Sequence, residues 1–201
     1  MRLGMVIDLK RCMGCYGCQM SCKAEHGTPP GVFFARLLKR EEGHYPNVRR
    51  ILLPVLCNHC TDAPCVKACP TAASYYAEHG IVDIDPEKCV GCRACMMACP
   101  YGNRYFYEEK RNYFGDEGPT PYEEARTERH AVGTVMKCNF CRPRLAEGKE
   151  PACVANCAAR ARTFGDLDDA ESDISRLIRE RSSFTLHPEA GTGPNVHYLA
   201  P

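Results

Sequence analysis

The sequence predicts an α+β fold in which two cysteine-bearing modules are interleaved along one chain. Sixteen of the 201 residues are cysteine, and they fall into four groups of four. Each group ends in two cysteines four positions apart, which is the spacing of one helical turn. Short apolar stretches with the pattern of strands precede the groups. Short strands that alternate with cysteine-rich turns and helices indicate the α+β class.

The strands are expected where β-branched or alternating apolar residues cluster. They are predicted at residues 4–9, 48–56, 80–85 and 162–169. The first three precede cysteine groups, and the last is expected to close a sheet.

Two helices have clear signals. One is expected to continue past Cys22 as far as Gly27, because no proline follows that cysteine. The other is expected over 169–182, where Ile174, Leu177 and Ile178 have helical spacing and arginines follow acidic residues. The last residues, 191–201, are expected to form an extended tail that becomes ordered on a neighbouring subunit.

The third cysteine group reads "CVGCRACMMACP" at 89–100, which is the spacing C-x2-C-x2-C-x3-C-P. This is the bacterial ferredoxin pattern, in which three cysteines hold one iron–sulfur cluster and the fourth holds the neighbouring cluster. Two alternatives stay open at this point. A disulfide framework needs an oxidising compartment, and structural zinc is usually held by two separated C-x2-C pairs. The repeated pattern favours iron–sulfur clusters over both.

The exchange of the fourth cysteine predicts the ligand sets. The second and third groups both end in Cys-Pro and form an inner pair of clusters, which leaves the first and fourth groups to form an outer pair. The predicted inner sets are Cys57, Cys60, Cys65 with Cys99, and Cys89, Cys92, Cys95 with Cys69. The predicted outer sets are Cys12, Cys15, Cys18 with Cys157, and Cys138, Cys141, Cys153 with Cys22.

This pairing predicts a domain organisation with pseudo-two-fold symmetry, made of two interleaved bacterial-type 2[4Fe-4S] ferredoxin modules. The predicted parts are an outer module of residues 1–56 with 130–169, an inner module of 57–107, an insertion of 108–129, and a C-terminal helix and tail of 170–201.

Residues near the ligands allow further expectations. A long spacer in the fourth group predicts a projecting basic loop at 142–149, which is either harmless length variation or a partner contact. His59 is expected to form a local hydrogen bond or to be exposed, and not to be a ligand. Basic side chains within two positions of a ligand are expected to be mostly solvated, although they could raise cluster potentials. They are Arg11, Lys23, Lys67, Lys88, Arg93, Lys137 and Arg142.

Several function classes have no support in the sequence. The formal charge of +1 and the lack of a basic block argue against nucleic-acid binding. No apolar run is long enough for a membrane span, and we expect no signal peptide, because only eleven residues precede the first cysteine. We find no nucleophile elbow, phosphate loop or dinucleotide fingerprint. The chain is therefore expected to move electrons and to have no catalytic residues of its own.

The order and spacing of the groups resemble a known family. The relevant segments are "DLKRCMGCYGCQMSCKAEHGTPPGV", "CNHCTDAPCVKACPTAA", "DPEKCVGCRACMMACPYGNRYF" and "KCNFCRPRLAEGKEPACVANC". They are similar to the four-cluster electron-transfer (beta) subunits of the dimethyl sulfoxide reductase family of molybdopterin oxidoreductases. The third cysteine is present in every group, Cys95 included, so the resemblance implies four [4Fe-4S] clusters. Ala158 departs from the family, whose members commonly have proline there.

The resemblance also implies partners. It predicts a relay between a molybdenum or tungsten molybdopterin catalytic subunit and a quinone-reactive membrane subunit or soluble carrier. A hydrogenase or formate-hydrogen-lyase assembly and a free polyferredoxin stay open as alternatives. Both a cytoplasmic location and a periplasmic one, reached by co-export with a twin-arginine-bearing partner, are compatible with such a role.

Overall fold

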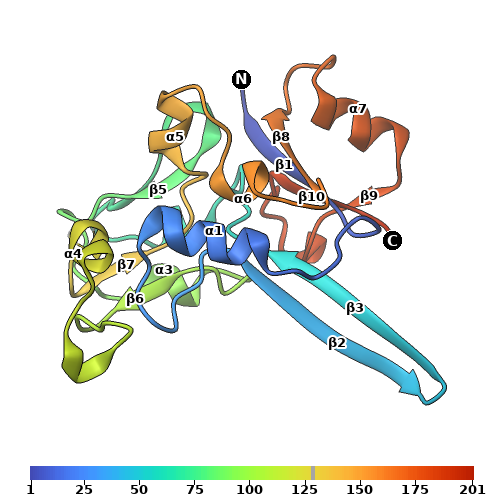
Figure 1. Cartoon of the computed structure of the whole chain (residues 1–201). Helices are drawn as coiled ribbons and strands as arrows, with labels where there is room; N and C mark the ends of the chain where they lie inside the picture. The colour runs from blue at the N-terminus through green and yellow to red at the C-terminus, as the bar shows by residue number, and fades with distance from the viewer. Residues whose placement is uncertain (128–129) are drawn as a thin grey trace.

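The computed structural model describes residues 1–127 and 130–201, and it has the predicted α+β architecture (Figure 1). A four-stranded sheet has the order β8–β1–β10–β9. Strand β1 pairs antiparallel with β8 and parallel with β10, so the two ends of the chain share one sheet. The strands are β1 (Leu3–Asp8), β8 (Arg162–Asp166), β9 (Ser183–Phe184) and β10 (Val196–Leu199).

A long hairpin projects from the body of the molecule (Figure 1). It consists of β2 (Arg36–His44) and β3 (Asn47–Val55). Its outer half is exposed on both faces, and Tyr45 at the turn is 93% exposed. Strand β3 was predicted and is confirmed, whereas β2 was not predicted.

Two short two-stranded sheets accompany the inner cysteine groups. Strand β4 (Ser74–Tyr76) pairs with β5 (Val82–Ile84), and β6 (Tyr105–Tyr107) pairs with β7 (Thr134–Met136). Helices α2 (Pro64–Lys67) and α3 (Ala94–Met97) pack against each other. The predicted strand at 80–85 is therefore confirmed, although it covers fewer residues.

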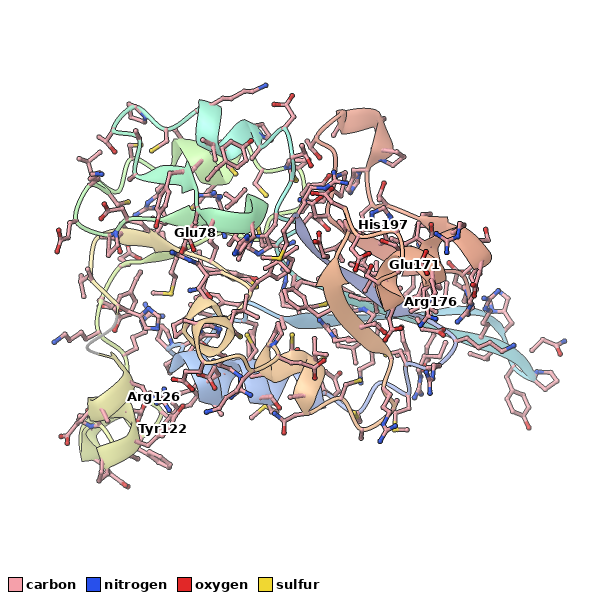
Figure 2. All side chains as sticks on the ribbon, turned by 90° about the horizontal axis from the view of Figure 1, so that it is seen from above. Glu78, Tyr122, Arg126, Glu171, Arg176 and His197 are labelled. Atoms are coloured by element: carbon pink, nitrogen blue, oxygen red, sulfur yellow. The ribbon has the colours of Figure 1, made fainter. Side chains whose placement is uncertain are left out.

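The remaining helices surround these strands. They are α1 (Gly17–His26), α4 (Pro121–Thr127), α5 (Arg142–Ala146), α6 (Ala152–Ala155) and α7 (Asp173–Glu180). Short 3-10 turns cover Glu78–Gly80, Gly115–Glu117 and Pro188–Ala190. Helix α1 packs on α6, and α7 packs on β1 and β8. The view from above shows α4, with Tyr122 and Arg126, at the opposite end of the molecule from Glu171 and Arg176 (Figure 2).

Helix α1 ends as the sequence predicted. Gly27 is left-handed (φ 58°), and its N–H donates to the Lys23 carbonyl. A Cβ at this position would also clash with the Cβ of Arg126. Glycine is thus required both by the backbone conformation and by the close approach of α4.

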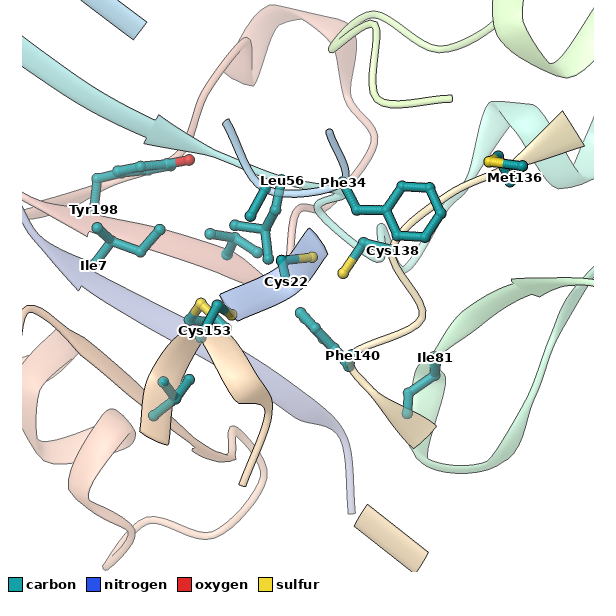
Figure 3. Close-up of a cluster of buried hydrophobic side chains, with 14 of the residues drawn as sticks. Ile7, Cys22, Phe34, Leu56, Ile81, Met136, Cys138, Phe140, Cys153 and Tyr198 are labelled. Atoms are coloured by element: carbon teal, nitrogen blue, oxygen red, sulfur yellow. The ribbon is translucent and has the colours of Figure 1, made fainter. Parts of the chain in front are cut away.

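The main hydrophobic core contains cysteines among its apolar side chains. Figure 3 shows Cys22, Cys138 and Cys153 buried together with Ile7, Leu56, Phe140 and Tyr198. Thiols therefore occupy positions that aliphatic side chains would fill in an ordinary core.

Two expectations were wrong. The C-terminal segment is not a free tail: β10 lies inside the sheet, where Val196 and Tyr198 are fully buried. The basic segment 142–149 does not project as a loop. Its first part is helix α5, and Arg142 and Arg144 form ion pairs with Asp83 and Glu25. The predicted insertion 108–129 includes α4, and its last two residues, 128–129, lie outside the described residues.

Candidate metal-cluster sites

The first site combines residues from both ends of the chain. One cavity is lined by Cys12, Cys15, Cys18 and Cys157, together with Arg162. The loop that carries the first three cysteines turns through left-handed backbone at Gly14 (φ 73°) and Tyr16 (φ 61°) before α1 begins. Cysteines from the first and fourth groups thus face the same space.

The second site repeats this arrangement with the inner groups. Its cavity is lined by Cys57, Cys60, Cys65 and Cys99, together with Asn58. Burial raises the pKa of the Cys60 thiol to about 11, and the neighbouring thiolates of Cys57 and Cys65 act in the same direction. A bound cation would reverse this effect, because metal ligation requires the deprotonated thiolate.

The third set lies deepest in the molecule. Cys22, Cys138 and Cys153 are all buried in the main core, and the Cys141 thiol is buried as well (Figure 3). Burial, reinforced by the nearby Cys153 and Cys141, raises the pKa of the Cys22 thiol well above its usual value. The neighbours of Cys22 in space therefore come from the fourth group.

The fourth set is carried by the helices of the inner cysteine groups. Cys89 and Cys92 precede α3, Cys95 is within α3, and Cys69 follows α2, which packs against α3. The Cys69 sulfur accepts a hydrogen bond from the Ser74 N–H (3.3 Å). Cys92 and Cys15 are both exposed, one in this set and the other in the first.

The four sets follow one another through space. The Cys153 thiol lies close enough to Cys18 for their charges to interact. The Cys138 thiol interacts electrostatically with Cys57 in the same way. The charge of Arg104 interacts with Cys65, Cys57 and Cys95. In space, the set that contains Cys12 is thus next to the set that contains Cys22. The set that contains Cys57 follows, and the set that contains Cys89 comes last.

The comparisons with known proteins agree with this chemistry. A family model described as a 4Fe-4S dicluster domain matches residues 48–115 and 117–167. The chain belongs to the 4Fe-4S dicluster family. It therefore binds 4Fe-4S clusters, as the cysteine spacing predicted.

The matches to curated relatives extend over nearly the whole chain. The iron–sulfur subunit of the arsenate respiratory reductase of Shewanella sp. strain ANA-3 is 40% identical over 99% of this chain and 96% of the relative. A selenate reductase subunit of Mesobacillus selenatarsenatis is 41% identical over 97% of this chain and 70% of the relative. A tetrathionate reductase subunit of Salmonella typhimurium is 39% identical over 98% of this chain and 72% of the relative. The predicted membership among iron–sulfur electron-transfer subunits of the dimethyl sulfoxide reductase family is confirmed.

The chain also contains two buried arginines that the sequence analysis missed. Arg104 donates from Nη2 to the Cys65 sulfur (2.9 Å). Arg162 donates to the sulfurs of Cys18 (3.5 Å) and Cys153 (3.7 Å). Each lies five residues beyond the nearest predicted ligand, outside the window in which we considered basic residues. Both arginines stand five positions after the last cysteine of their group, Cys99 or Cys157, and this shared spacing could have identified them from the sequence.

Of the basic residues that were considered, two are withdrawn from solvent. The Lys137 ammonium is buried and donates to the carbonyls of Val82 and Cys138. The half-buried Lys23 donates to oxygens of Thr28, Pro29 and Val32, and burial lowers its pKa to about 8.

Orphaned polar atoms beside the thiols fit an anionic sulfur cluster. His59 is fully buried and accepts the Val82 N–H at Nδ1, so the expected hydrogen bond is present, but its partner is 23 residues away in the sequence and the side chain is not exposed. Within the described part of the chain, its Nε2 and both amide atoms of Asn58 have no hydrogen-bond partner. Asn58 lines the second cavity. The His59 Nε2–H and the Asn58 amide N–H groups can donate to cluster sulfurs, whereas the Asn58 Oδ1 atom can only accept.

Among residues 1–127 and 130–201, no group of three His, Cys, Asp or Glu side chains is placed to hold a single metal ion. The same residues include no helix that is long and apolar enough to cross a membrane.

Proposed function

We propose that this chain is an electron-relay subunit with four 4Fe-4S clusters, held by the four cysteine sets that the sequence predicted. The observation that carries this proposal is the exchange of the last cysteine. Cys157 lines the cavity of Cys12, Cys15 and Cys18, and Cys99 lines that of the second group. This is the cross-ligation expected of paired ferredoxin clusters.

The proposed modules are interleaved with pseudo-two-fold symmetry. The outer module joins residues 1–56 to 130–169, and it surrounds the inner module of 57–107. The pairing of β1 with β8 supports this arrangement, because it brings the first and fourth groups together. Arg104 and Arg162 contact equivalent cysteines in the two modules, which supports it further.

The clusters exchange single electrons when they are bound, and the protein sets their order and surroundings. The exposed Cys15 and Cys92 belong to the first and last sets in the spatial order. We therefore place the entry and exit of electrons at these two ends. The partners in our proposal are a molybdopterin catalytic subunit on one side and a quinone-reactive membrane subunit or soluble carrier on the other. The relatives named as arsenate, selenate and tetrathionate reductase subunits support a reductase assembly.

Elemental analysis of the complex purified anaerobically from its native cells tests this function. We expect about sixteen irons per chain together with molybdenum or tungsten. Iron with nickel would favour a hydrogenase assembly, and iron without another metal would favour a free polyferredoxin. Zinc without iron would refute the proposal.

A further inference from the structure

Two buried arginines occupy equivalent positions in the two proposed modules. Arg104 follows Cys99 by five residues, and Arg162 follows Cys157 by five residues. Arg104 immediately precedes β6, and Arg162 is the first residue of β8. Each is 4% exposed. The two side chains are therefore placed by the same local arrangement, a cysteine turn that leads into a short strand.

Their contacts are equivalent as well. Arg162 lies between Cys18 and Cys153, which are the third cysteines of the first and fourth groups. Arg104 donates to Cys65, the third cysteine of the second group, and its charge also interacts with Cys95, the third cysteine of the third group. In the proposed ligand sets, each arginine therefore bridges two adjacent clusters.

Neither arginine has a carboxylate partner among the residues that the structure describes. No ion pair formed within residues 1–127 and 130–201 includes Arg104 or Arg162. The other polar contact of Arg104 is the Ser74 hydroxyl (2.7 Å), and that of Arg162 is the Met5 sulfur (3.5 Å). A buried guanidinium without an anion is strongly unfavourable, and it cannot lose its charge. Cysteine thiolates on the clusters are the anions within reach.

We propose that Arg104 and Arg162 raise the reduction potentials of the two clusters that each one contacts. The inference rests on the proposed function, because it requires clusters at these cysteines. A reduced cluster is more negative than an oxidised one, so a fixed buried cation stabilises the reduced state. Hydrogen bonds to the cysteine sulfurs act in the same direction. Exposed basic residues beside the ligands are screened by water and contribute little.

Potentiometric titration of the intact anaerobic complex, followed by EPR, tests this role. The variants are Arg162→Gln and Arg104→Gln, with Lys88→Gln as the matched control. Lys88 adjoins Cys89, but its side chain is 64% exposed. We expect each arginine variant to lower the equilibrium constant for reduction of two clusters at least tenfold, which is about 59 mV for a one-electron couple. The two arginine variants should affect different pairs of clusters. In the Lys88→Gln control, the equilibrium constant for reduction of each cluster should change less than threefold.

The iron and sulfide content of each variant shows whether its clusters are bound, and this distinguishes a failure of the tuning proposal from a failure of the relay function. An arginine variant with full iron and potentials within threefold of the parent would overturn the inference and leave the relay function intact. A parent complex without reducible clusters would overturn the relay function itself. If a glutamine variant binds too little iron, Arg162→Met and Arg104→Met take its place, and the same tenfold decrease is expected. Arg162→Lys and Arg104→Lys are the charge-conserving controls. They keep the charge and should load fully, with potentials within threefold of the parent. A tenfold drop in a loaded lysine variant would contradict the charge-based role.

Discussion

Deletion of residues 196–201 should destroy the fold, because β10 is an inner strand of the sheet. The deletion removes Val196, Tyr198 and Leu199, which are at most 1% exposed. Burial of each such side chain contributes roughly 1.5–3 kcal/mol, so the three together contribute roughly 5–9 kcal/mol. This is comparable with the whole stability of a typical domain, roughly 5–15 kcal/mol. The deletion would also leave one edge of β1 unpaired.

The residues just before β10, which the strand anchors, hold the loop between Cys57 and Cys65. The Asn195 N–H donates to the Asn58 carbonyl (2.9 Å), and its amide donates to the His59 carbonyl (2.5 Å). The Thr61 N–H donates to the Gly193 carbonyl (2.8 Å). These contacts fix the loop between Cys57 and Cys65. Loss of β10 should therefore release iron from the second set as well as lower stability.

A point variant gives a graded form of this test. Leu199→Ala should cost about 2–5 kcal/mol, which lowers the melting temperature by about 4–20 °C in a chain of this size. Tyr45→Ala is the control, because Tyr45 is 93% exposed, and it should stay within about 0.5 kcal/mol of the parent. The measurement is thermal loss of visible cluster absorption and circular dichroism under anaerobic conditions. A deletion variant with full iron and an unchanged melting temperature would refute the reasoning.

Two further predictions concern ligation and pH. Cys22→Ser should alter the EPR signal of the cluster held by the fourth group, because its neighbours in space are Cys141 and Cys153; an altered signal from the first group instead would contradict the cross-ligation. Burial, with the nearby charge of Arg2, lowers the pKa of His197 below its usual 6.5. The unfolded chain therefore binds more protons, and stability should fall as the pH drops below 6.5. His197→Gln should reduce this dependence, and an unchanged slope between about pH 7 and pH 5.5 would exclude His197 as its source.

The parts of the fold that depend on local chemistry could be predicted from the sequence. The cysteine spacings predicted the cofactor, and they also predicted that Cys157 would join the first group. The apolar patterns of β1, β3, β5 and β8 were sufficient to place those strands. Gly27 and the absence of a proline after Cys22 predicted the length of α1.

Features that depend on distant contacts could not be predicted in this way. Strand β2 is mostly charged and exposed, so it carries no apolar alternation, and its pairing with β3 defines it. Strand β10 has only four residues and follows a segment that contains glycine and proline. It forms a strand because it pairs with β1, at the other end of the chain. The burial of Arg104 and Arg162 depends on side chains that other groups supply.

The register of β1 and β8 links the sheet to the proposed tuning of the clusters. Arg162 pairs with Ile7, and Gly4 pairs with Gly165. A Cβ on Gly4 would clash with the Leu167 side chain and would lie 2.7 Å from the Asn195 carbonyl oxygen, so these contacts hold the strand in one position. A slip of one residue would turn Arg162 to the opposite face of the sheet, away from Cys18 and Cys153. Because Asn195 immediately precedes β10, the C-terminal strand holds this contact in place and so stabilises the register that positions Arg162 between Cys18 and Cys153.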